Sequence, residues 1–110
     1  MENQNQTQEQ ELTPEEEKII DRLFEEWAKF APHCTPGETR YFVVKTEDAG
    51  GNPIYILIDY DNSIAAVCYQ LLDEMSCSAT DDGNIAMALA YLYWYGGKEI
   101  DKGLAYSPCP

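Results

Sequence analysis

The chain has 110 residues, and its 20 Asp and Glu residues against 7 Lys and Arg residues give a formal net charge of −13 at pH 7. The length is typical of one domain, and 45% hydrophobic residues indicate a chain that folds. The charge argues against direct binding to nucleic acid or to an anionic membrane, because both need a basic footprint. No apolar run is long enough for a transmembrane helix.

Residues 2–11 are Gln, Asn and Glu apart from Thr7, so no apolar residue lies between the initiator Met1 and Leu12. Such a segment buries too little surface to offset its ordering entropy, so we expect a disordered acidic, Gln-rich tail over residues 1–12. It lacks the cationic start and apolar core of a signal peptide, which predicts a cytoplasmic location. A single domain over residues 13–106 and a C-terminal tail over residues 107–110 complete the predicted organisation.

A helix is predicted from Thr13 onwards. Thr13 is a typical N-cap, Pro14 suits the first helical position, and Glu16 completes a capping box. Apolar residues then recur at helical spacing, and Pro32 ends the pattern. The predicted buried stripe consists of Ile20, Leu23, Phe24, Trp27 and Ala31.

Two strands are predicted next, over residues 41–46 and 54–60, because both segments are rich in β-branched and aromatic residues. The residues between them include two Gly and one Pro, which favours an antiparallel hairpin. In the second strand Ile54, Ile56 and Ile58 share the face expected to be core. Tyr55 lies on the opposite face, which we expect to be only partly covered.

Two more helices are predicted. One begins after three capping residues, 61–63, and follows helical spacing from Ile64 to Met75. The other begins near residues 80–84, runs to about Tyr95, and carries two apolar stripes. The first stripe is Ile85, Ala88, Leu89 and Leu92, and the second is Met87, Tyr91 and Trp94.

Apolar residues on most faces are typical of a helix at the centre of a fold, although the sequence does not decide between a central and a flanking place for this last helix. Beyond it, Ile100, Leu104 and Tyr106 either pack onto the core or form a third strand. The predicted fold class is therefore α+β, in the order α-β-β-α-α, with a small antiparallel hairpin or sheet packed against three helices.

Four cysteines are present, at positions 34, 68, 77 and 109. Two disulfides are the less favoured interpretation in a cytosolic chain, whose thiols stay reduced. Zinc is disfavoured because no close C-x2-C pair occurs. Cys68 is instead expected to be a small core residue on the predicted helix from Ile64.

Enzymatic interpretations have little support. His33 and Cys34 are neighbours in a Pro-flanked loop, where a nucleophile and its base seldom converge. The clusters Asp59–Asn62 and Asp81–Asp82 could hold a cation through oxygen ligands, but both lie where helix N-caps are expected. We therefore predict no catalytic residue, no metal site and no cofactor.

The distribution of charge is the most informative feature. From Thr46 to Gly97 the sequence has no Lys or Arg but eight carboxylates. The negative electrostatic field of these carboxylates speeds association with a basic partner. Exposed Tyr rings add cation–π contacts with the Lys and Arg side chains of such a partner. The predicted partner-binding residues are Glu47, Asp48, Tyr55, Asp59, Asp61, Tyr69, Asp73, Glu74, Asp81 and Asp82.

In size, acidity and expected element order, the chain resembles the small acidic proteins that phages use against bacterial defence, including some type II anti-CRISPR inhibitors. That resemblance implies a non-enzymatic inhibitor that occupies a basic, nucleic-acid-binding surface of a partner protein as a nucleic-acid mimic. It transfers no individual residue. The alternative is a small homo-oligomeric structural or accessory protein that associates through Tyr91–Tyr95, for example as a homodimer, and whose acidity serves only solubility.

Overall fold

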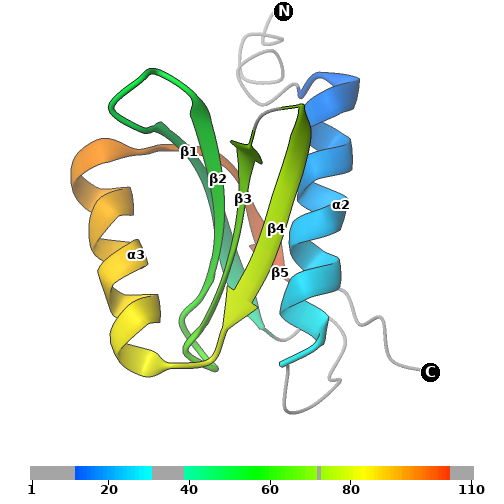
Figure 1. Ribbon diagram of the computed structural model, residues 1–110. Helices are drawn as coiled ribbons and strands as arrows, with labels where there is room; N and C mark the ends of the chain where they lie inside the picture. Colours follow the sequence, from blue (N-terminus) through cyan, green and yellow to red (C-terminus); the bar gives the residue numbers. More distant parts are fainter. Residues whose placement is uncertain (1–11, 31–38, 72, 105–110) are drawn as a thin grey trace, which may run out of the picture.

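The computed structural model describes residues 12–30, 39–71 and 73–104. Over these residues the protein has three layers, with one helix on each face of a five-stranded sheet (Figure 1). The elements in chain order are α2 (Pro14–Ala28), β1 (Arg40–Glu47), β2 (Pro53–Asp59), β3 (Ile64–Leu71), β4 (Glu74–Thr80), α3 (Gly83–Gly96) and β5 (Lys98–Leu104).

The sheet is antiparallel throughout and has the strand order β4-β3-β2-β1-β5. The predicted hairpin of β1 and β2 is confirmed, with Tyr41 opposite Asp59. The segment around Ile100 forms a strand, because β5 pairs with β1 at the sheet edge, and Ile100 also packs against the core. The register of this pair shifts between Val43 and Val44, as at a β-bulge.

Helix α2 forms as its sequence predicts. The Thr13 hydroxyl accepts a hydrogen bond from the Glu16 backbone N–H, and the Glu16 carboxylate accepts one from the Thr13 backbone N–H. The Phe24 ring meets the rings of Trp27 and Tyr41 edge to face. The apolar stripe of α2 packs against β2, β3 and β4, and the Tyr41 ring adds a contact with β1.

The prediction of three helices is wrong, because the segment from Ile64 to Thr80 forms strands β3 and β4 instead of a helix. The start of β3 is almost continuously apolar, and such a run satisfies helical spacing and a doubly buried strand equally well. The capping residues before it belong to the turn between β2 and β3, where Ser63 adopts a positive φ of 56°. The fold class is still α+β, with two helices among the described residues.

Both faces of β2 are buried, which corrects the expectation that one face is only partly covered. Ile56 and Ile58 pack beneath α3 together with Val44 and Ala90. Tyr55 and Leu57 pack beneath α2, and Tyr55 is buried. A central strand covered by a helix on each side has no solvent-facing side, so its polar residues are not surface markers.

Cys68 is buried, as predicted, but it lies on a strand and forms a disulfide with Cys77. The two residues are direct partners across β3 and β4. This pairing contradicts the expectation that Cys68 is a reduced thiol. Cys34 and Cys109 lie outside the described residues.

Several further predictions also fall outside the described residues: the tails, except Leu12, together with Ala31, Pro32, His33 and Tyr106. Leu12 packs against the core beneath α2. Neither described helix is long and apolar enough to cross a membrane.

Candidate protein-interaction surface

Helix α3 begins where capping residues direct it. The Asp82 carboxylate accepts hydrogen bonds from the backbone N–H groups of Asn84 and Ile85, at 2.9 and 3.3 Å, which satisfies two donors of the first turn. The Thr80 hydroxyl in turn accepts a hydrogen bond from the Asp82 backbone N–H. The helix is therefore fixed at its start by the end of β4.

The side of α3 that faces the sheet is narrow. Ala86 and Ala90 are buried, and the half-buried Leu89 and Tyr93 flank them. Small alanine side chains let the helix lie close to the sheet, but they bury little apolar surface.

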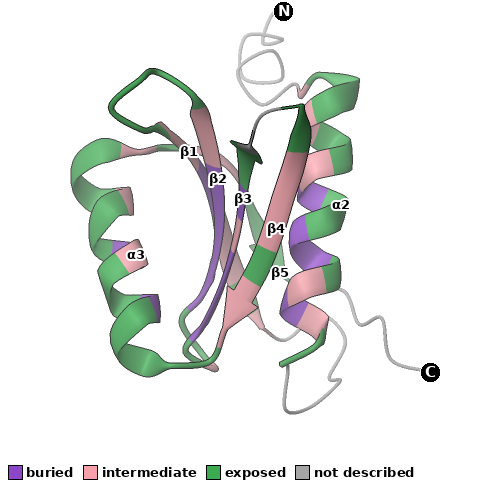
Figure 2. Cartoon of the chain, in the orientation of Figure 1, coloured by how far each residue is buried: buried purple, intermediate pink, exposed green. Residues whose placement is uncertain are grey.

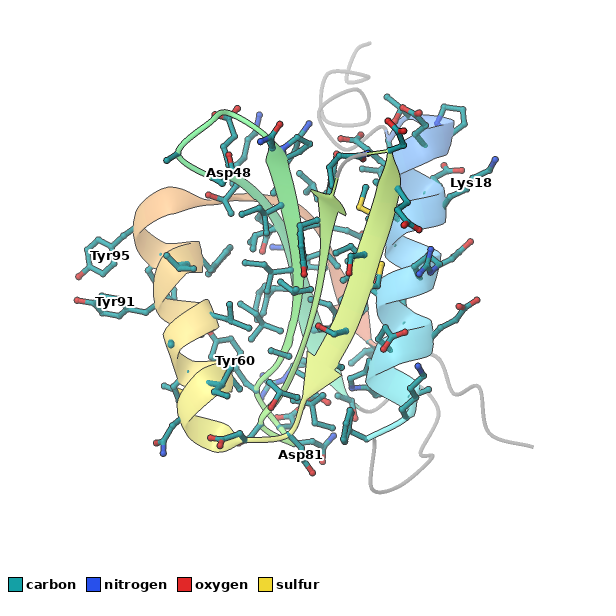
Figure 3. All side chains as sticks on the ribbon, viewed as in Figure 1. Lys18, Asp48, Tyr60, Asp81, Tyr91 and Tyr95 are labelled. Carbon is teal, nitrogen blue, oxygen red and sulfur yellow. A yellow bond between two sulfur atoms is a disulfide. The ribbon has the colours of Figure 1, made fainter. Side chains whose placement is uncertain are left out.

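The outward half of α3 is apolar and exposed. We call this surface the aromatic face. Figure 2 shows α3 as mostly exposed, and in Figure 3 the labelled Tyr91 and Tyr95 point away from the sheet. No charged residue occurs between Gly83 and Gly97. The side chains of the aromatic face are 48% to 76% exposed, and they are Ile85, Met87, Tyr91, Leu92, Trp94 and Tyr95.

Ring contacts order part of this surface. Tyr91 and Tyr95, one helical turn apart, have ring centroids 4.6 Å apart. The Trp94 ring lies 5.2 Å from that of Tyr93, whose hydroxyl donates a 3.1 Å hydrogen bond to Glu99 on β5. Burial and this bond raise the pKa of Tyr93, so its hydroxyl stays protonated and donates at neutral pH. Tyr93 thus connects the aromatic face to the sheet.

A hollow of about 510 Å³ lies beside the C-terminal end of α3. It is bounded by the end of β1, by Glu47 and Asp48, and by Gly96 and Lys98. The Thr46 hydroxyl donates a 2.9 Å hydrogen bond to the carbonyl of Gly96, which fixes the helix end against β1. Because of its volume, the hollow offers space for a side chain of a partner next to the aromatic face.

Seven of the eight predicted carboxylates are exposed, but the structure does not bring them into one patch. Because loops of an antiparallel sheet alternate between its two ends, the seven form two groups. A strand of seven residues separates the groups by about 23 Å. One group is Glu47, Asp48, Asp73 and Glu74, and the other is Asp61, Asp81 and Asp82.

Three of these carboxylates also hold local structure. Asp48 accepts hydrogen bonds from the backbone N–H groups of Gly50 and Asn52, and the bond from Asn52 is the main cause that lowers the pKa of Asp48. Asp61 accepts a 3.0 Å hydrogen bond from the Arg40 backbone N–H. Asp82 caps α3. All three side chains are exposed, so each still contributes to the surface charge.

Two predicted partner-binding residues, Asp59 and Tyr55, lie in the interior instead. Asp59 accepts a 2.6 Å hydrogen bond from the Trp27 indole N–H and two 3.0 Å bonds from Asn62. These bonds satisfy a buried carboxylate and fasten α2 to the turn after β2. Neither Asp59 nor Tyr55 is available to a partner, so we leave both out of the surface. Tyr69 is 37% exposed on the α3 side of β3.

Within the part of the chain that the structure describes, no group of three or more His, Cys, Asp or Glu side chains could hold a metal ion. The predicted absence of catalytic residues is not tested, since His33 and Cys34 lie outside that part.

The aromatic face of α3 was not among the predicted partner-binding residues, although Tyr91–Tyr95 was predicted as a surface for self-association in the alternative hypothesis. The sequence showed its second stripe of Met87, Tyr91 and Trp94, but a stripe of that kind is equally typical of a core. The discriminating signal was the small size of the residues on the opposite side, Ala86 and Ala90, which mark the face closest to the sheet.

Comparison with known proteins finds no matching family model, no matching curated protein and no matching solved structure.

Proposed function

We propose that this protein is a non-enzymatic binding protein that docks on a basic protein partner through the aromatic face of α3. The single observation that carries the proposal is that α3 presents six large apolar side chains to solvent with no charge among them. A contiguous apolar patch of this kind is typical of an interaction site, because its burial removes apolar surface from water. Tyr, Trp and Met are also the residues enriched in interface cores.

The charge supports a basic partner. Acidic residues border α3, with Asp81 and Asp82 at its start. Glu47 and Asp48 lie beside its end, in a hollow that Lys45 and Lys98 also line. Carboxylates around an apolar centre suit a partner with Lys or Arg around an apolar patch. Two copies of this chain, each of net charge −13, would repel one another at the same approach. A second copy is therefore the weaker candidate for the occupant.

The proposal includes inhibition of a nucleic-acid-handling protein, because nucleic-acid-binding surfaces are strongly basic. In it the carboxylates border the contact and do not imitate a phosphate backbone. A duplex carries one charge per about 1.7 Å of its axis, whereas about 23 Å separate the two acidic groups here. A cytoplasmic location stays a prediction. The Cys68–Cys77 disulfide argues against it, because disulfides are uncommon in a reducing cytosol.

The test is affinity capture from a cell lysate at low and high salt, with four versions of the protein as bait. They are the wild type, Tyr91→Ser with Trp94→Ser, Asp73→Lys with Glu74→Lys, and Asp21→Lys with Glu25→Lys. The last pair reverses two charges on the exposed side of α2, away from the proposed surface, and is the matched control.

We expect the wild type and the α2 control to capture the same basic protein at low salt. The α3 variant should lose it, and the Asp73/Glu74 reversal should weaken its capture at low salt. Equal capture by the α3 variant would contradict the proposal. A wild type that sediments as a dimer, with a monomeric α3 variant, would instead favour self-association.

A further inference from the structure

Strand β4 differs from the other edge of the sheet. Among the described residues it pairs only with β3, so its second side lies at the sheet edge (Figure 1). The opposite edge strand, β5, carries four charged residues, which protect an edge against added strands. From Met75 to Thr80, β4 carries no charge and no proline.

The geometry identifies the backbone groups that this edge offers. Cys68 and Cys77 are opposite each other with Cα atoms 4.2 Å apart. That short separation is typical of a non-hydrogen-bonded pair, so the N–H and C=O groups of Cys77 point away from β3. Because successive residues of a strand direct their N–H and C=O groups to opposite sides, the N–H and C=O groups of Met75 and Ala79 also point away from β3. The disulfide holds the edge in one register relative to β3.

Carboxylates lie at both ends of this uncharged stretch of β4. Asp73 and Glu74 stand at its start, and Asp81 and Asp82 follow its end. If a second copy paired through β4, either strand direction would place acidic ends against acidic ends, and such like-charge contacts are unfavourable. The charges instead suit a strand with an uncharged centre and basic ends.

We propose that the edge of β4 binds an extended segment of a partner protein as a sixth strand, and that this segment carries Lys or Arg at both ends of an uncharged stretch. Main-chain hydrogen bonds to Met75, Cys77 and Ala79 supply the affinity, as in other cases of strand addition, and the acidic ends select the segment. This inference does not depend on the aromatic face of α3, because the two surfaces share only the bordering carboxylates Asp81 and Asp82.

The test uses two synthetic peptides with the full-length protein. Both have alternating Thr and Val residues matched to the length of β4; one has two Lys at each end, and the other has two Glu. Binding is followed by the backbone amide signals of the ¹⁵N-labelled protein in a titration. We expect the Lys peptide alone to bind, with loss of affinity in high salt. The amides of Met75, Cys77 and Ala79 should shift and become protected from hydrogen exchange.

The variant Ala79→Pro removes one outward N–H without removing a bond to β3, and proline is tolerated at such edge positions. We expect it to bind the Lys peptide about two- to tenfold more weakly, as the loss of one hydrogen bond predicts. Ala79→Val keeps the N–H and is the matched control. If Ala79→Pro fails to fold, the amide shifts of the wild type still decide the question.

The proposal is overturned if the Lys peptide does not bind, if the Glu peptide binds equally well, or if the shifted amides lie on α3. It is also overturned if the β4 amides of the free protein become protected from hydrogen exchange as the protein concentration is raised and a dimer forms. That result would show that a second copy occupies the edge. Equal capture of the partner by the wild type and the α3 variant, together with an intact peptide titration, would refute the proposed function alone.

Discussion

The two helices are almost equal in length and cover opposite faces of one sheet, yet their outward sides differ. Helix α2 buries four large side chains and exposes charged ones. Helix α3 buries two alanines and exposes six large apolar side chains. The outward side of α2 is suited to water, whereas that of α3 is suited to another apolar surface. Helix α2 therefore mainly stabilises the fold, whereas α3 mainly offers a surface.

The free energy of unfolding should respond most differently to truncation of Leu23 and of Tyr91. Leu23 is fully buried, so Leu23→Ala should lower the free energy of unfolding by about 2–5 kcal/mol through lost burial and a cavity. Tyr91→Ala removes a larger side chain that is 63% exposed and should change stability by no more than about 0.5 kcal/mol. Chemical denaturation of both variants checks this. Equal losses would show that α3 is as much a part of the core as α2.

The next comparison uses the two tryptophans of the chain. Trp27→Phe removes the indole donor from the buried Asp59 carboxylate and should cost about 1–3 kcal/mol. Trp94→Phe removes an indole from a side chain that is 69% exposed and should leave stability nearly unchanged. Thermal and urea unfolding measure both effects. A stable Trp27→Phe variant would mean that the bond to Asp59 does not hold α2 in place.

The smallest expected effect is a pH dependence at α2. Burial raises the pKa of Glu16, but hydrogen bonds from Thr13 and Lys45 outweigh it, so the pKa lies below its ordinary value of 4.5. The stability that this lowering supplies is present above pH 4.5 and is lost as the pH falls through the lower, folded-state pKa.

The Glu16→Gln variant should therefore lose less stability in acid than the wild type does. The difference should be below about 1 kcal/mol, because Lys45 is 41% exposed and solvent screens its ion pair with Glu16. Urea unfolding between pH 3 and 7 measures this, with the exposed Glu17→Gln as the control. An identical pH profile for the Glu16→Gln variant and the wild type would remove Glu16 from the account.

How far the sequence predicts the fold depends on how local its signals are. The capping box of α2, the hairpin of β1 and β2, and the cap of α3 at Asp82 are set by neighbouring residues, and all three predictions are confirmed. The segment from Ile64 to Thr80 was predicted wrongly because its identity depends on distant partners. Only the presence of a helix on each side of the sheet makes its apolar run a central strand.

For the candidate site, too, local features could be predicted from the sequence, whereas features that depend on distant contacts could not. Charge can be counted in the sequence, but the sequence does not show that Asp59 is buried beneath Trp27 or that the exposed carboxylates lie at two ends of the sheet. The importance of α3 depends on which of its sides meets the sheet, and periodicity alone does not decide that for a helix apolar all round.

The proposed function requires that the aromatic face of α3 is open in the free protein and covered by a partner. ¹⁹F NMR of the protein labelled with 5-fluorotryptophan tests it directly, with the Trp94 signal assigned by its absence in Trp94→Phe. A soluble paramagnetic reagent should broaden the Trp94 signal and spare that of Trp27, and addition of the captured partner should protect Trp94. A Trp94 signal as protected as that of Trp27 in the free protein, or one unchanged by the partner, would contradict the account.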